Sequence, residues 1–138
     1  MTHVDPGRTA FDAFKALDRD EPVEMLNLIR LREHARYPDG RAATGAAAYA
    51  EYGARSAPVL ARVGGRILWR GAPRLTLIGP AGERWDIAFV AGYPSAGAFL
   101  AMVTDPDYQR EAVPHRQAAV ADSRLIRNAP LPPSDRFG

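Results

Sequence analysis

The distribution of apolar positions predicts a helix and then a strand at the start of the chain. The stripe formed by Phe11, Phe14 and Leu17 is typical of a short helix, and Thr9 is a suitable N-cap. Residues 23–31 are apolar at both odd and even positions. This pattern indicates a strand that is covered on both of its faces.

The next apolar pattern predicts a long helix over residues 46–63, with Thr44 as its cap. Pro58 lies inside this helix and should kink or split it, because proline has no backbone N–H to donate. The polar stretch over residues 33–45 indicates a long loop before the helix.

The middle of the chain predicts a β-hairpin. Two β-rich pieces, residues 66–70 and 74–78, flank Gly71-Ala72-Pro73. Glycine and proline mark bends within strands, so we interpret both pieces as one bent or bulged strand. A strand over residues 85–93 should pair with it.

The last part of the chain predicts helical segments followed by a final strand. Between residues 95 and 121, Asp105 caps a restarted helix and Pro114 breaks the helix again. The apolar pair at 125–126 belongs to the last strand, and the proline-rich tail 130–138 should be irregular.

The order of these elements predicts an α+β fold. An α-β-α-β-β-α-β order contains the ferredoxin-like βαββαβ unit, an antiparallel sheet with helices on one face, preceded by an added N-terminal helix. The length of 138 residues suits a single domain. We expect a core over 23–128, an N-terminal helical extension over 1–22 and the irregular tail 130–138.

The predicted strands are apolar on both faces, whereas the helices can cover only one. The other face would leave a large apolar patch in water, which monomers rarely tolerate. We therefore expect a homodimer in which two sheets pack face to face.

The composition limits the cellular compartments and the classes of partner that we expect for this protein. The chain has no cysteine, which excludes disulfides and thiolate nucleophiles and is natural in a reducing cytoplasm. No apolar run approaches the roughly 18 residues of a membrane span, so we expect a soluble protein with no membrane contact. The net charge is only +2 and the arginines are scattered, so we expect no nucleic-acid partner.

No pattern indicates a metal or cofactor. His3, His34 and His115 are far apart and lack the spacing of metal ligands. Neither a phosphate-binding loop nor a Gly-x-Ser-x-Gly elbow is present. We expect no metal and no cofactor.

His115 is the candidate catalytic residue. It lies between Pro114 and Arg116 at a predicted helix break, and imidazole can act as an acid or a base near neutral pH. Arg116 could bind a substrate carboxylate or enolate through two hydrogen bonds. We expect His115 at the edge of a cavity between the sheet and the 95–121 helical region. Alternatively, it caps a helix or hydrogen-bonds a backbone carbonyl.

Four further residues are candidates for substrate binding. Asn27 is an amide within an apolar strand and could hold a substrate carbonyl, or it could satisfy an adjacent loop. Tyr49, Tyr52 and Trp69 offer the aromatic surface of a small-molecule pocket, but a core or a dimer interface uses the same residues.

Several short motifs together resemble the family called domain of unknown function 1330, over residues 23–128. They are Met25-Leu26-Asn27-Leu28, Tyr37-Pro38-Asp39-Gly40-Arg41, Tyr93-Pro94-Ser95, Asp105-Pro106-Asp107-Tyr108, His115-Arg116 and Asp122-Ser123-Arg124-Leu125. The resemblance implies a ferredoxin-like monomer of the dimeric α/β-barrel superfamily. Relatives there include cofactor-free monooxygenases, muconolactone isomerases and stress-responsive barrels, while the family's own activity is not established.

Three functions remain open at this point. The first is a cofactor-free enzyme of the isomerase, lyase or monooxygenase type, acting on a small apolar or aromatic organic acid. It rests on analogy of fold. The others are a non-catalytic ligand-binding or stress-response protein, and a purely structural dimer whose polar core residues fix its packing.

Overall fold

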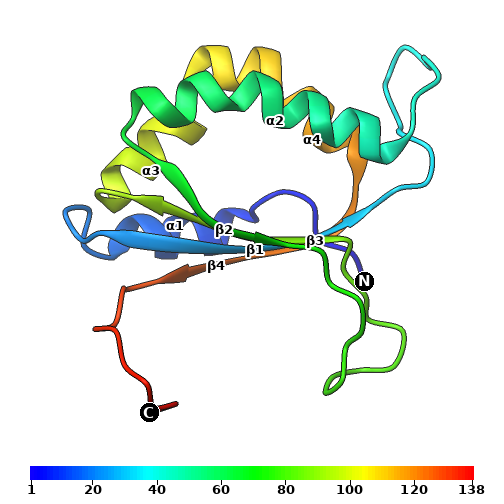
Figure 1. Ribbon diagram of the computed structural model, residues 1–138. Helices are drawn as coiled ribbons and strands as arrows, with labels where there is room; N and C mark the ends of the chain where they lie inside the picture. Colours follow the sequence, from blue (N-terminus) through cyan, green and yellow to red (C-terminus); the bar gives the residue numbers. More distant parts are fainter.

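The computed structural model describes all residues, 1–138, and shows a four-stranded antiparallel sheet with helices on one face (Figure 1). This is the predicted ferredoxin-like α+β fold with an added N-terminal helix. In chain order the elements are α1 (Arg8–Ala16), β1 (Val23–Leu31), α2 (Gly45–Arg62), β2 (Arg66–Gly71), β3 (Ile87–Tyr93), α3 (Ala96–Val103), a π-helical turn (Tyr108–Ala112), α4 (Val113–Ala119) and β4 (Val120–Asn128).

The sheet has the order β2-β3-β1-β4, so the two central strands are β3 and β1. Asn27 of β1 lies opposite Phe89 of β3 on one side and Leu125 of β4 on the other. All pairings are antiparallel, as each of the two βα units crosses to a non-adjacent position.

The alternation of side chains along β1 separates two faces of the sheet. Met25 and Ile29 are buried beneath the helices, whereas Leu26 and Leu28 point to the other side and are only half-buried. We call the side away from the helices the outer face. It is covered by no helix (Figure 1).

Two apolar clusters fill the space between the sheet and the helices. One contains Tyr93, Phe99 and Met102 beneath α3. The other contains Ile29 and Val120 beneath the start of α2. None of the helices is long and apolar enough to cross a membrane.

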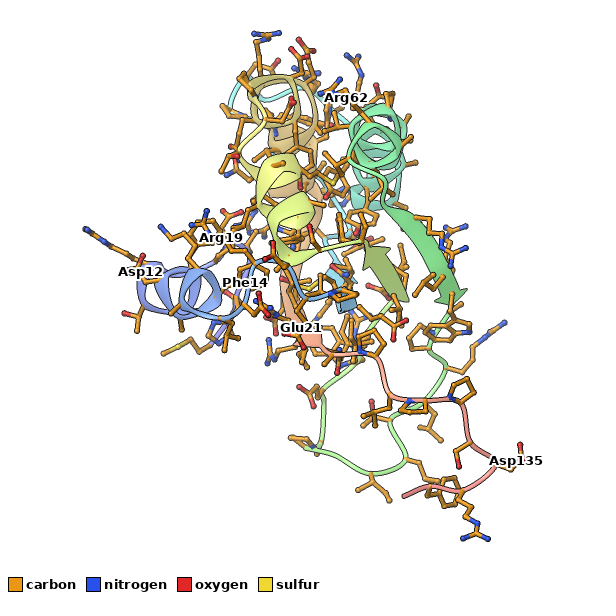
Figure 2. All side chains as sticks on the ribbon, turned by 90° about the vertical axis from the view of Figure 1, so that its left-hand side faces the viewer. Asp12, Phe14, Arg19, Glu21, Arg62 and Asp135 are labelled. Atoms are coloured by element: carbon orange, nitrogen blue, oxygen red, sulfur yellow. The ribbon has the colours of Figure 1, made fainter.

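Helix α1 lies beyond β4, the edge strand, and reaches back toward α3 (Figure 2). Phe14 points from α1 toward the sheet, and its ring centroid lies 5.0 Å from that of Phe99. The helix begins one residue before the expected Thr9 cap, and its N-cap is Gly7, which makes no side-chain hydrogen bond.

The predicted second half of the bent strand is not a strand. β2 ends at Gly71, and residues 72–86 form a loop instead. β2 is an edge strand with β3 as its only partner, so a longer strand would need a longer β3. The irregularity in the pairing of β2 with β3 lies between Ile67 and Trp69, ahead of the expected bend.

Both helical prolines are accommodated without a break. α2 continues through Pro58. The carbonyl of Ala54 lacks its usual donor because proline has no N–H. Both residues are exposed, so this carbonyl can bond to water. Pro114 lies in the first turn of α4, directly after the π-helical turn, where a missing N–H costs little.

Candidate ligand cavity

A cavity of about 1040 Å³ lies between the inner face of the sheet and the helices, on the side of β4. This volume is at the upper end of the range typical of small-molecule sites. Of the 28 lining residues, 17 are hydrophobic. Helix α1 and the segment before it form the wall beyond β4, and exposed lining residues such as Leu17 and Gln117 mark where the cavity meets solvent.

Asn27 lies in the floor of the cavity, flanked on neighbouring strands by Phe89 and Leu125. Its side-chain nitrogen donates to the carbonyl of Met25 over 3.0 Å. The side-chain oxygen makes no hydrogen bond to the protein. A ligand donor in the cavity could therefore use this oxygen.

Two tyrosine hydroxyls meet in the wall opposite the floor. The hydroxyl of Tyr52, from α2, lies 2.8 Å from that of Tyr108, from the π-helical turn. Burial, reinforced by Tyr52, raises the pKa of Tyr108 far above its ordinary value, so its phenol stays protonated. The pair can share one hydrogen bond internally and still offer one donor to a ligand.

Arg116, from α4, is one of the charged residues that line the cavity. Its guanidinium donates to the backbone carbonyl of Val4 over 2.5 Å and to the hydroxyl of Ser123 over 3.5 Å. The carboxylate of Asp5 lies 3.7 Å away, and only 14% of the Arg116 side chain is exposed. Arg116, Ser123 and Asp5 therefore form a polar end of the cavity.

The N-terminal segment is tied to β4 beside Arg116. Ser123 donates from its hydroxyl to the carbonyl of His3 over 2.7 Å, and the amide of His3 donates to Asp122 over 2.8 Å. Although burial alone would raise it, the pKa of Asp122 is held below its ordinary value by the amide of His3 and by Arg124. These contacts fix the segment that closes the polar end of the cavity.

Arg127 of β4 binds the end of α1, which forms the wall of the cavity away from its polar end. It donates to the carbonyls of Phe14, over 3.3 Å, and Asp18, over 2.7 Å, and pairs with Glu21 at 3.1 Å. Its guanidinium also lies 4.6 Å from the centre of the Phe14 ring. One arginine therefore holds both the end of α1 and the chain that follows it.

The charges that line the cavity are mostly positive. Arg116, Arg124 and Arg127 belong to the lining, and Asp5 is the only acidic residue among the lining residues. Each of these arginines also pairs with a carboxylate: Arg116 with Asp5, Arg124 with Asp122 and Glu83, and Arg127 with Glu21. A guanidinium has five N–H donors, so a paired arginine of the lining can still donate to an anionic group of a bound molecule.

Three of the five predicted binding residues line the cavity, namely Asn27, Tyr52 and Arg116. Tyr49 does not. It is buried in the second apolar cluster, and burial raises its pKa far above the ordinary value. Trp69 lies opposite Val90 on the outer face of the sheet, where 55% of it is exposed.

His115 does not line the cavity, contrary to the position expected for it. Its Nδ1 atom lies 2.7 Å from the hydroxyl of Tyr37, which belongs to the loop between β1 and α2. Successive residues of a helix point in different directions, so Arg116 faces the cavity while His115 faces the loop. A catalytic role for His115 remains a prediction.

Sequence reasoning did not identify Tyr108, Ser123, Arg127 and the residues around Val4 as parts of this cavity. The alternation of β4 carries a signal for two of them, because Ser123 and Arg127 share a face with Leu125. The contribution of Val4 carries no such signal, since it depends on a contact between residues 112 positions apart. No group of three or more His, Cys, Asp or Glu side chains is placed to hold a metal ion.

The chain is similar to one solved protein of unknown function over nearly its whole length. The crystal structure of RPA0582 from Rhodopseudomonas palustris is 56% identical, covers 96% of this chain and 100% of that chain, and has a TM-score of 0.90. The structure of methylated RPA0582 is 57% identical, covers 98% and 100%, and has a TM-score of 0.92.

A more distant structure shares only part of the arrangement. It is a dimeric protein of unknown function with a ferredoxin-like fold from Bacteroides fragilis, 14% identical over 78% of this chain and 95% of that chain, with a TM-score of 0.49. No curated protein matches the chain. The model of the domain of unknown function DUF1330 matches residues 41–129, and the chain therefore belongs to the DUF1330 family.

Proposed function

We propose that this protein binds a small, largely apolar or aromatic organic acid in the cavity beneath α1. The observation that carries the proposal is the composition of the lining, which is mainly hydrophobic but includes a few polar side chains, among them Asn27, Tyr108 and Arg116. A few placed polar groups in an apolar site are what orient a small ligand. A purely structural dimer would have no need of so large an open space.

The ligand carboxylate would lie near Arg116 and Ser123. Ser123 lies opposite Ile29 on β1, two residues from Asn27, so its hydroxyl and the Asn27 amide are diagonal neighbours on the inner face. The apolar body of the ligand would then extend along Phe89 and Tyr93 toward Phe99.

Catalysis on such an acid, without a cofactor, is the second candidate and includes isomerase, lyase and monooxygenase types. The supporting observation is the Tyr52 and Tyr108 pair, which can donate one hydrogen bond to a developing enolate. In this version Asn27, Tyr52 and Arg116 position the substrate. His115 lies outside the lining and would need to act from beyond it.

A thermal-shift titration with aryl carboxylates, from benzoate to 3-phenylpropionate, tests the binding proposal, with the matching neutral amides as controls. We expect the acids to raise the melting temperature and the amides to have a much smaller effect. Arg116→Gln should weaken acid binding by about 10- to 100-fold, the usual weight of a charged hydrogen bond. Arg110→Gln, on the exposed surface, is the matched control. Equal shifts by acids and amides, or none by either, would contradict the proposal.

We also propose that the protein is a homodimer that pairs through the outer face of the sheet. Leu26, Leu28 and Val90 form the centre of that face, and Leu68 and Ile126 at its sides are 39% and 47% exposed. A continuous apolar surface of this kind on a sheet calls for a partner. Sedimentation at micromolar concentration should give twice 15.0 kDa, and a monomer would contradict this.

We place the protein in the cytoplasm, in keeping with its lack of cysteine. Fractionation of cells that produce it should recover it with cytoplasmic markers.

A further inference from the structure

The most exposed large apolar side chains, apart from Met1, gather in two segments, the 72–86 loop and the 129–138 tail. Both segments project beyond the outer face of the sheet, away from the helices (Figures 1 and 2). The exposed fractions are 80% for Leu75, 86% for Leu77, 93% for Ile78, 86% for Leu131 and 115% for Phe137. Side chains of this kind usually avoid such exposure in groups.

Hydrogen bonds and an ion pair fix the conformation of the 72–86 loop, so its apolar side chains are held in the solvent. The hydroxyl of Thr76 donates to the carbonyl of Glu83 over 3.0 Å and closes the loop across its tip. The side chain of Glu83 pairs with Arg124 of β4 at 3.6 Å. At the base, Asp86 accepts from the amide of Leu31 over 2.7 Å.

The two segments leave the sheet at opposite ends. The loop follows Gly71, which pairs with Ala88, and the tail follows Asn128, which pairs with Glu24 at the far end of β1. Figure 1 shows them hanging from the two ends of the sheet on the same side. A body that covered the outer face would therefore lie between them.

We propose that the 72–86 loop and the 129–138 tail are two arms that clasp a second copy of this chain, which is stacked on the outer face. The inference rests on the proposed homodimer and adds the residues that extend its interface. In a twofold dimer each copy supplies both arms and receives both arms of its partner. The apolar tips would then be buried at the rim of the paired sheets.

The charges on the arms favour a second copy over a lipid surface. The loop carries Glu83 beside Arg84, and the tail carries Asp135 beside Arg136. In the loop, Glu83 pairs with Arg124 and Arg84 pairs with Asp86, so the loop offers no strong charge of one sign and can meet its own copy without repulsion. Binding to anionic lipid would call for a cluster of basic residues, which neither arm has.

Sedimentation equilibrium of three variants tests the arms. One carries Leu77→Ser with Ile78→Ser, one ends after Ala129, and the control is Leu17→Ser, on the α1 side of the molecule. We expect the dimer dissociation constant to rise about 10- to 100-fold in the first two variants, because each loses buried apolar area. The control should match the unmodified chain.

Thiol labelling gives a second readout that does not depend on weakening the dimer. The chain has no cysteine, so Leu77→Cys and Leu17→Cys each introduce a single thiol. The thiol at position 77 should react with a maleimide at least 10-fold more slowly above the dimer dissociation constant than below it. The thiol at position 17 should react at one rate throughout.

The two proposals fail in different ways. A dimer with unchanged affinity in both arm variants, or with a position 77 thiol that reacts equally fast at all concentrations, would overturn the arms alone. A monomeric unmodified chain would overturn the homodimer and the arms together, and would assign the segments to another occupant.

Discussion

Two arginine side chains hold the N-terminal segment against the cavity, and each of them donates to several acceptors at once. Arg116 joins the carbonyl of Val4 to Ser123, while Arg127 joins Phe14, Asp18 and Glu21. A planar guanidinium can hold several donors in fixed directions, which a lysine ammonium does not. Arg116 therefore attaches the segment around Val4 to α4, and Arg127 attaches the end of α1 to β4.

Removing the Arg127 contacts should release α1. We expect Arg127→Ala to lower the free energy of unfolding by about 2 kcal/mol, the scale of hydrogen bonds to a charged group. Amide hydrogen exchange in α1 should rise more than exchange in the sheet. Arg8→Ala, which removes an exposed arginine of α1, should change neither quantity. Unchanged exchange in α1 of the first variant would show that apolar packing alone holds the helix.

The contact between His115 and Tyr37 predicts a stabilising role for the imidazole. His115→Gln should lower the melting temperature by about 2–6 °C, because glutamine does not place a hydrogen-bonding atom where Nδ1 lies. Tyr37→Phe should lower it by a similar amount, and the double variant by little more. Affinity for the aryl acids should stay the same. A stable variant whose turnover falls by roughly 10²–10⁴ would instead support catalysis by His115.

At the scale of elements, the local sequence predicted those features that depend on neighbouring residues, such as helix caps and strand bounds. Thr44 and Ser95 cap α2 and α3 through their side chains, and β1 has the expected bounds of Val23–Leu31. Residues 74–78 look like a strand by composition, but a strand also needs a free partner, and β3 offers none there. The absence of a strand there is a property of the pairing, which a local pattern does not contain.

The turn at Asp105 predicts a dependence of stability on pH. The amide of Tyr108 and the guanidinium of Arg62 hold the pKa of Asp105 below its ordinary value. A carboxyl with a lowered pKa stabilises the fold above its unfolded pKa of about 3.9, and this effect is lost as the pH falls through the folded value. Asp105→Asn should therefore lower the melting temperature at pH 7 and have a smaller effect near pH 3.

Thermal unfolding of both proteins in steps from pH 7 to pH 3 measures this difference. Asparagine still caps a helix but does not titrate, so it isolates the charge from the cap. A difference that stays constant over the whole range would contradict the assignment.

At the scale of the molecule, the fold was more predictable than the site. The order of the elements implies the sheet and its two faces, and the polar residue Asn27 stands out from the apolar strand around it. The cavity itself arises from residues far apart in the chain, because α1 lies against β4 and the segment around Val4 reaches Arg116. Trp69 illustrates the ambiguity, since an aromatic residue suits a pocket or an interface equally.

A homodimer should also have a melting temperature that depends on protein concentration. Pairing stabilises the folded chain by mass action, so the apparent melting temperature should rise with protein concentration. For two chains of this length we expect about 2 °C per tenfold change. Scanning calorimetry from 1 to 100 μM measures this, and a constant melting temperature would argue for a monomer.

The position of α1 outside the sheet has a consequence for how this protein can diversify. The first 22 residues add no strand, lie outside the span 41–129 matched by the family model, and yet supply one wall of the cavity. Changes in that segment can alter which molecules enter while the hydrogen-bonded ladder and the outer face stay untouched. Under the proposed function, the preference of the cavity for one ligand over another could therefore change through a short piece of chain that the architecture itself does not require.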